Sequence, residues 1–93
     1  MTVNVELFAS PACTRCAQAK RKLQRLVETV GDDRLEWRAI DVLDEIDYAV
    51  ALGVLSIPAI AINGVLVFSK LPSTKELRCV LIERLATDAA AGR

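Results

Sequence analysis

The stretch SPACTRCAQAKRKL, residues 10–23, marks the point where the pattern of the chain changes. Before it, apolar and polar residues alternate; after it, apolar residues recur every three or four positions. Cys13 and Cys16 lie at this junction, in a chain with one further cysteine and no histidine. A C-x-x-C motif in this place is compatible with a metal-binding site, a redox couple or ordinary core residues. The residues around the motif distinguish these uses.

The residues on either side of the junction predict a strand followed by a helix. Val3, Val5 and Leu7 alternate with polar residues, which is typical of a half-buried strand. From Cys13 onward, apolar residues occur at positions 16, 19, 23, 26, 27 and 30, the spacing of an amphipathic helix that Gly31 ends. The two cysteines are therefore expected at the start of a helix.

The rest of the chain completes an α/β pattern. Asn63-Gly64 favours a type I′ turn between two strands, and Ser73 with Glu76 has the form of a helix capping box. The expected elements are a strand over 35–41, a short helix over 45–52, strands beginning at 58 and 65, a helix over 74–87 and a frayed tail over 88–93. The order βαβαββα predicts a four-stranded mixed sheet flanked by helices, with a parallel first pair and an antiparallel hairpin.

Length and composition restrict the classes of function. A chain of 93 residues forms one domain, here 1–93, and we expect a monomer. Twelve basic and twelve acidic side chains cancel, which argues against nucleic acid as a partner. No segment has the roughly 20 apolar residues of a membrane span and the N-terminus lacks signal-peptide features, so a cytoplasmic protein without a membrane partner is expected.

The position of each cysteine predicts its chemical role. Cys16 lies at the margin of the apolar stripe of its helix, whereas Cys13 is rotated about 60° outward. Cys13 also meets the open N–H groups at the helix N-terminus, which favour a thiolate, and Arg15 adds a nearby positive charge. We therefore predict Cys13 as nucleophile, Cys16 as resolving thiol, Arg15 as the residue that tunes the Cys13 pKa, and a couple more oxidising than one with Gly-Pro between the cysteines.

Other uses of the motif remain open at this point. A closed zinc site needs four nitrogen or sulfur ligands, and Cys79 is the only further thiol, so zinc would require a dimer. Two thiolates suit Cu(I), although known small copper-carrier domains place a hairpin directly after the first helix. Iron–sulfur binding through Cys13 and Cys16 and a redox-inert interaction module are the remaining alternatives. No bound cofactor or metal is expected, Cys79 is interpreted as an incidental exposed thiol, and Trp37 as a packing residue.

The second informative stretch, SIPAIAING at 56–64, brings in a family resemblance. A strand, a C-x-x-C motif opening a helix, and later a hydrophobic-Pro pair opening a strand resemble the thioredoxin/glutaredoxin superfamily, in particular small glutaredoxin-like thioredoxins. The resemblance covers residues 3 to about 87 and implies a thioredoxin-like fold. It also implies that Pro58 is a cis-proline beside the disulfide and that the backbone of Ile57 docks the extended chain of a substrate.

The resemblance implies a thiol–disulfide oxidoreductase that acts on disulfides in protein substrates. Electrons would come from a reductase or a low-molecular-weight thiol. Thr14-Arg15 stands where thioredoxins have Gly-Pro, and a Gly-Gly segment that helps glutaredoxins hold glutathione is absent, so strong glutathione binding is not implied. The cations Arg15, Lys20, Arg21, Lys22 and Arg25 are interpreted as a solvated helix face, with steering of anionic partners as the alternative.

Overall fold

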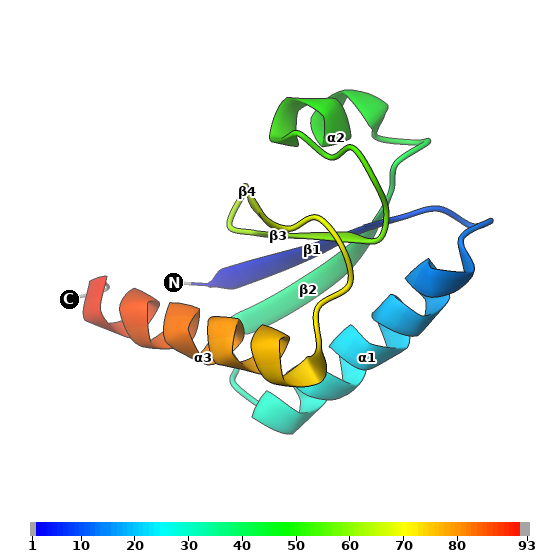
Figure 1. The fold of residues 1–93 in the computed structure, drawn as a ribbon. Coiled ribbons are helices and arrows are strands. Elements are labelled where there is room, and N and C mark those ends of the chain that lie inside the picture. The colour runs from blue at the N-terminus through cyan, green and yellow to red at the C-terminus, as the bar shows by residue number, and fades with distance from the viewer. Residues whose placement is uncertain (1, 92–93) are drawn as a thin grey trace.

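The computed structural model describes residues 2–91, which form one sheet and three helices (Figure 1). The elements are β1 (Val3–Ala9), α1 (Thr14–Val30), β2 (Leu35–Asp41), α2 (Ile46–Leu52), β3 (Ala59–Ile62), β4 (Val65–Phe68) and α3 (Thr74–Ala91). This is the predicted βαβαββα order. Helix α3 continues to Ala91, beyond its expected end, and the last part of the predicted frayed tail, 92–93, lies outside the described residues.

The sheet is mixed, as predicted, with the strand order β2-β1-β3-β4. Strand β1 pairs in parallel with β2 and antiparallel with β3, and β3 pairs antiparallel with β4. The expected turn joins β3 to β4, because Asn63 and Gly64 have φ values of 51° and 80°, the positive angles that a type I′ turn needs. Strand β1 is therefore central, and its carboxyl end leads directly into the cysteine motif.

Helices α1 and α3 cover one face of the sheet and α2 covers the other (Figure 1). Side chains of β1 alternate between the faces: Val5 and Leu7 pack with Leu23 of α1 and Leu81 of α3, whereas Phe8 packs with Ala49 of α2. Trp37 packs at the edge of the α1–α3 core, which confirms its interpretation as a packing residue. The alternation divides the interior into two apolar clusters on opposite sides of one sheet.

Two local features fix how the helices begin and end. Gly31 ends α1 with a left-handed φ of 62°, and its N–H donates to the Val27 carbonyl at 3.0 Å. The capping box of α3 is confirmed, since Ser73 Oγ accepts from the Glu76 N–H at 3.1 Å and Glu76 Oε1 accepts from the Ser73 N–H at 3.4 Å. Of the helices within 2–91, none combines the length and apolar character needed to cross a membrane.

Strand β1 differs from the sequence-based expectation in one respect. An alternating, half-buried strand places Glu6 in solvent, but Glu6 is only 6% exposed. The reason is that α2 lies over this face of the sheet and brings Tyr48 to the carboxylate, while the adjacent strand supplies Arg38. The second face of the sheet therefore buries a charge that the local pattern assigns to water.

Candidate active site

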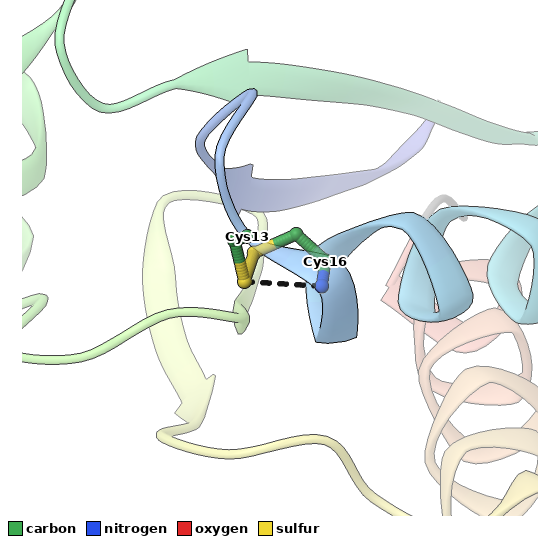
Figure 2. The surroundings of a disulfide bond; sticks show 2 residues. All are labelled: Cys13 and Cys16. Carbon is green, nitrogen blue, oxygen red and sulfur yellow. Dashed lines mark hydrogen bonds between the residues drawn. A yellow bond between two sulfur atoms is a disulfide. The ribbon is translucent and has the colours of Figure 1, made fainter.

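Cys13 and Cys16 lie at the N-terminus of α1, where the loop after β1 turns into the helix (Figure 2). The loop is closed by a hydrogen bond from the Cys13 N–H to the Ser10 carbonyl at 3.1 Å. The two sulfurs form a disulfide, and the Cα atoms are 5.2 Å apart. The structure thus brings the two predicted site cysteines together within one helical turn.

Cys13 is the N-cap residue of α1 through its sulfur. Its backbone is extended, with φ −93° and ψ 111°, and its Sγ accepts from the Cys16 N–H at 3.1 Å, the dashed line of Figure 2. An N-cap side chain satisfies one of the open donors of the first helical turn. Here that acceptor is a sulfur, so a negative charge on Cys13 would face a backbone donor and the positive end of the helix dipole.

The two sulfurs differ in their access to solvent. Cys16 is 3% exposed and belongs to the buried face of α1, whereas Cys13 is half-buried in the loop before it. This confirms the expectation that Cys16 is the more buried cysteine. A partner approaching from solvent meets Cys13 first.

Ile57 and Pro58 line the same hollow as Arg15, on one side of the cysteine motif. The peptide bond between Ile57 and Pro58 is cis, as the resemblance implies. Pro58 is buried and Ile57 is half-buried, and together with Arg15 and Lys70 they line a hollow of about 410 Å³. Arg15 is exposed on the first turn of α1, so its guanidinium can move above this hollow.

A second hollow, of about 310 Å³, lies on the other side of the cysteine motif. Cys13 and Cys16 line it together with Lys20 of α1 and Asp41 of β2. Asp41 is not among the residues that the sequence pattern predicts for the site. The parallel pairing of β1 and β2 could have indicated it, because parallel strands end at the same edge of a sheet. Ala9, four residues before Cys13, pairs with Asp41 at that edge.

The buried acid Glu6 lies on the α2 face of the sheet and forms a separate polar cluster. Its carboxylate accepts from Arg38 Nη2 at 2.6 Å and from the Tyr48 hydroxyl at 2.5 Å. The hydrogen bond to Glu6 and burial raise the pKa of the Tyr48 hydroxyl above its usual value. These three residues line a hollow of about 830 Å³ that none of the cysteines lines.

Other thiols and carboxylates of the described residues add little to the site. Cys79 is free and exposed on α3, as expected. Within residues 2–91, no group of three or more cysteine, aspartate or glutamate side chains is arranged to hold a metal ion. The cysteine pair is thus the centre of the candidate site.

Comparison with known proteins agrees with this geometry. The family described as "Thioredoxin domain" matches residues 1–82. The chain belongs to the thioredoxin family. A probable thioredoxin of Methanothermobacter thermautotrophicus is 38% identical over 77 residues, which cover 83% of this chain and 89% of that protein. A thioredoxin of Methanocaldococcus jannaschii is 32% identical over 83 residues, covering 89% and 96%.

Solved thioredoxin structures share the fold. Thioredoxin 1 of Thermosipho africanus superposes with a TM-score of 0.74 at 19% identity, over 92% of this chain and 98% of that one. The family match and the archaeal relatives together make this chain a thioredoxin-like thiol–disulfide oxidoreductase whose C-x-x-C pair is Cys13–Cys16.

Proposed function

We propose that this thioredoxin-family protein reduces disulfides in protein substrates, with Cys13 as the attacking and Cys16 as the resolving sulfur. The asymmetry of the pair carries the proposal: Cys13 is half-buried and caps the helix, whereas Cys16 is 3% exposed. A dithiol cycle requires one sulfur that a substrate can reach and a second that waits beside it.

The first step transfers the substrate to the protein. The Cys13 thiolate attacks one sulfur of the substrate disulfide, a new sulfur–sulfur bond forms, and the substrate's second sulfur leaves as a thiolate that takes a proton from water. The Cys16 N–H, which donates to Cys13 Sγ at 3.1 Å, stabilises the attacking thiolate. The product of this step is a mixed disulfide between Cys13 and the substrate.

The second step releases the substrate. Cys16 attacks Cys13 Sγ, the bond between Cys13 and the substrate breaks, and the Cys16 proton passes to the departing substrate sulfur. The substrate has gained two electrons and two protons, and the protein is left with the Cys13–Cys16 disulfide. A reductase dithiol or two molecules of a low-molecular-weight thiol then reduce this disulfide by the reverse exchange, without a bound cofactor.

Three further residues have proposed supporting roles. Ile57 and Pro58 form the wall along which an extended substrate chain docks, which their shared hollow with Arg15 supports. Arg15 stabilises the Cys13 thiolate and thereby the reduced form, which makes the couple more oxidising. We further propose that the protein is a monomer and works in the cytoplasm, where thiols such as the exposed Cys79 stay reduced.

The test is a redox titration of the Cys13–Cys16 pair in graded thiol–disulfide buffers, read by thiol trapping and mass spectrometry. A reversible two-electron transition between about −300 and −120 mV would support a working couple, and because of Arg15 we expect its potential above the approximately −270 mV of thioredoxin. Arg15→Ser should move it to a more negative potential. If no intramolecular disulfide forms, or if a copper or zinc ion protects both thiols from trapping, the oxidoreductase proposal is wrong.

Single-cysteine variants separate the two roles. Cys16→Ser should accumulate the mixed disulfide with a substrate, because the attacking sulfur remains and the resolving sulfur is missing. Cys13→Ser should form no such complex, since Cys16 is buried. The opposite result would assign attack to Cys16.

A further inference from the structure

The cations of α1 are strongly segregated from the acidic residues. Residues 10–27 contain five cations and no acid, although basic and acidic side chains balance over the whole chain. Residues 41–47, at the end of β2 and the start of α2, contain four acids and no cation. The two signs of charge are therefore segregated along the chain.

The structure gathers part of this basic charge into a groove between α1 and α3. Arg21, Lys22 and Arg25 of α1 and Arg78 of α3 line a hollow of about 460 Å³, and no acidic side chain lines it. Helices α1 and α3 pack against each other on the same face of the sheet (Figure 1). Arg78 is distant from α1 in the sequence, so the fold creates a charge cluster that the helix pattern alone does not contain.

These cations have free donors. The ion pairs among the described residues, Arg34–Asp32 and Arg38–Glu6, involve none of them. Lys22 donates to the Pro72 carbonyl at 3.3 Å, which anchors the groove without neutralising it. Arg21, Arg25 and Arg78 are exposed. A groove lined by one sign of charge concentrates field lines and attracts ligands of the opposite sign.

The groove continues into the proposed docking wall. Gln18 lines both this groove and the hollow that contains Arg15, Ile57 and Pro58. From Arg15 to Arg25 the helix rises by about 15 Å, at roughly 1.5 Å per residue. An extended chain covers this distance with four to five residues, at about 3.3 Å each. A polypeptide that enters the docking wall is therefore led along the cations.

We propose that the α1–α3 groove is a docking surface for an acidic segment of the disulfide-containing protein substrate. The proposal rests on the function proposed above and names the class of substrate that the site prefers. A polypeptide is favoured over a compact anion because the cations are spread along two helices and begin at the docking wall. Charges of this kind accelerate encounter and select partners more than they add affinity.

The experiment uses three peptides, each with the same internal disulfide, flanked by four glutamates, four serines or four lysines. Reduction by the pre-reduced protein is followed by quenching and mass spectrometry. At low salt, the glutamate peptide should be reduced at least about ten times faster than the lysine peptide. A factor of about ten is the lower end of the rate increases that electrostatic steering produces. The difference should shrink in 0.5 M salt, where charges are screened beyond a few ångströms.

Charge-reversal variants locate the effect. Arg21→Glu/Arg25→Glu/Arg78→Glu should lose the preference for the glutamate peptide, measured as the ratio of its rate to that of the serine peptide. Arg25→Glu alone should lower the preference about threefold, as expected for one exposed charge contact. The control for Arg25→Glu is Arg84→Glu, which changes the net charge of the protein by the same amount. Arg84 lies on α3 outside the groove, so this variant should keep the preference for the glutamate peptide.

The outcomes distinguish failure of the docking proposal from failure of the proposed oxidoreductase activity. Equal rates for all three peptides in the wild type, or an equal loss in Arg25→Glu and Arg84→Glu, would overturn the docking proposal while leaving the oxidoreductase intact. If no peptide is reduced, the proposed function fails, and the groove is then judged by fluorescence anisotropy of a cysteine-free glutamate peptide. Binding lost in the triple variant would support the acidic docking surface, and absence of binding to the wild type would overturn it.

Discussion

The two faces of the sheet are built by different means. The face under α1 and α3 is packed by apolar side chains such as Leu23, Leu77 and Leu81, all fully buried. The face under α2 has a smaller apolar cluster and a buried carboxylate, Glu6, held by Arg38 and Tyr48. Apolar burial is strong but non-directional, whereas hydrogen bonds to a buried charge fix one geometry. The first face supplies stability, and the second sets where the short α2 lies.

This difference bears on the active site, because each face supports a different part of it. Helix α1 carries the cysteines and is held by the larger cluster, through Leu23 and Leu26. Ile57, in the proposed docking wall, packs instead against the smaller cluster beneath α2. The cysteine helix therefore depends on apolar packing, and the docking wall depends on the position of α2.

The largest effect is expected from opening the α1–α3 core. Leu23→Ala leaves a cavity among fully buried side chains and should lower the free energy of unfolding by about 2–5 kcal/mol. Leu52→Ala, at a half-buried position of α2 on the opposite face, removes less buried surface and should cost less. Urea unfolding of both variants measures the difference. Equal costs would show that the two faces share the stability evenly.

A smaller loss of stability is expected when Arg38, the exposed partner of the buried Glu6, is replaced. The side chain of Arg38 is 61% exposed and that of Glu6 is 8% exposed. Arg38→Met therefore leaves a buried carboxylate with Tyr48 as its remaining hydrogen-bond donor, and should lower the free energy of unfolding by less than Leu23→Ala does. Urea unfolding of Arg38→Met beside the wild type at pH 7 measures the loss.

Glu6→Gln is the control for this prediction. It keeps the shape of the side chain and leaves Arg38, which is exposed and can be hydrated by water. Its cost at pH 7 should be smaller than that of Arg38→Met. If Glu6→Gln proves the more damaging variant, the carboxylate is stabilised by the fold beyond its pair with Arg38.

The element order could be predicted from the sequence because each element has a local signal. Apolar periodicity, the Asn63-Gly64 turn and the Ser73–Glu76 capping box each depend on residues a few positions apart, and all three are confirmed. The relative burial of Cys13 and Cys16 also follows from their angular positions on one helix. Local geometry was sufficient for these features.

Glu6 and Asp41 could not be placed in this way. Glu6 is buried because Tyr48, 42 residues away in the sequence, lies over it, and no local pattern contains that contact. Asp41 reaches the hollow beside the cysteines because β1 and β2 are parallel and in register at Ala9. Both features come from tertiary pairing: the predicted parallel pair could have indicated Asp41, whereas the contact of Glu6 with Tyr48 has no signal in the sequence pattern.

Tyr48 allows a more direct test of the α2 face, with a smaller expected effect. It is the only tyrosine, so the absorbance change of tyrosinate reports this residue alone. The hydrogen bond to Glu6 raises its pKa, so titration of the folded protein should have a midpoint above the usual value of about 10. Glu6→Gln should lower the midpoint, and unfolding in urea should return it to about 10.

The same shift predicts how stability changes at alkaline pH. The raised pKa favours neutral Tyr48 in the folded state, so its contribution is complete below about 10 and is lost as the pH rises through the folded-state pKa. Tyr48→Phe should remove this part of the alkaline decline and cost about 0.5–1.5 kcal/mol at neutral pH for the lost hydrogen bond. An unchanged alkaline decline in Tyr48→Phe would assign it to other groups.

The smallest effect is expected at an exposed ion pair on the α1–α3 side, which contrasts with the buried pair under α2. Asp32 accepts from Arg34 Nη2 at 2.8 Å, and this hydrogen bonding lowers the Asp32 pKa to about 2. Its stabilisation is therefore present above the ordinary pKa and is lost as the pH falls from about 4 toward 2. Asp32→Asn should change the urea midpoint slightly at pH 7 and flatten the acid decline in that window. Since both partners are partly solvated, a loss as large as that of Arg38→Met would show that burial is not what distinguishes the two pairs.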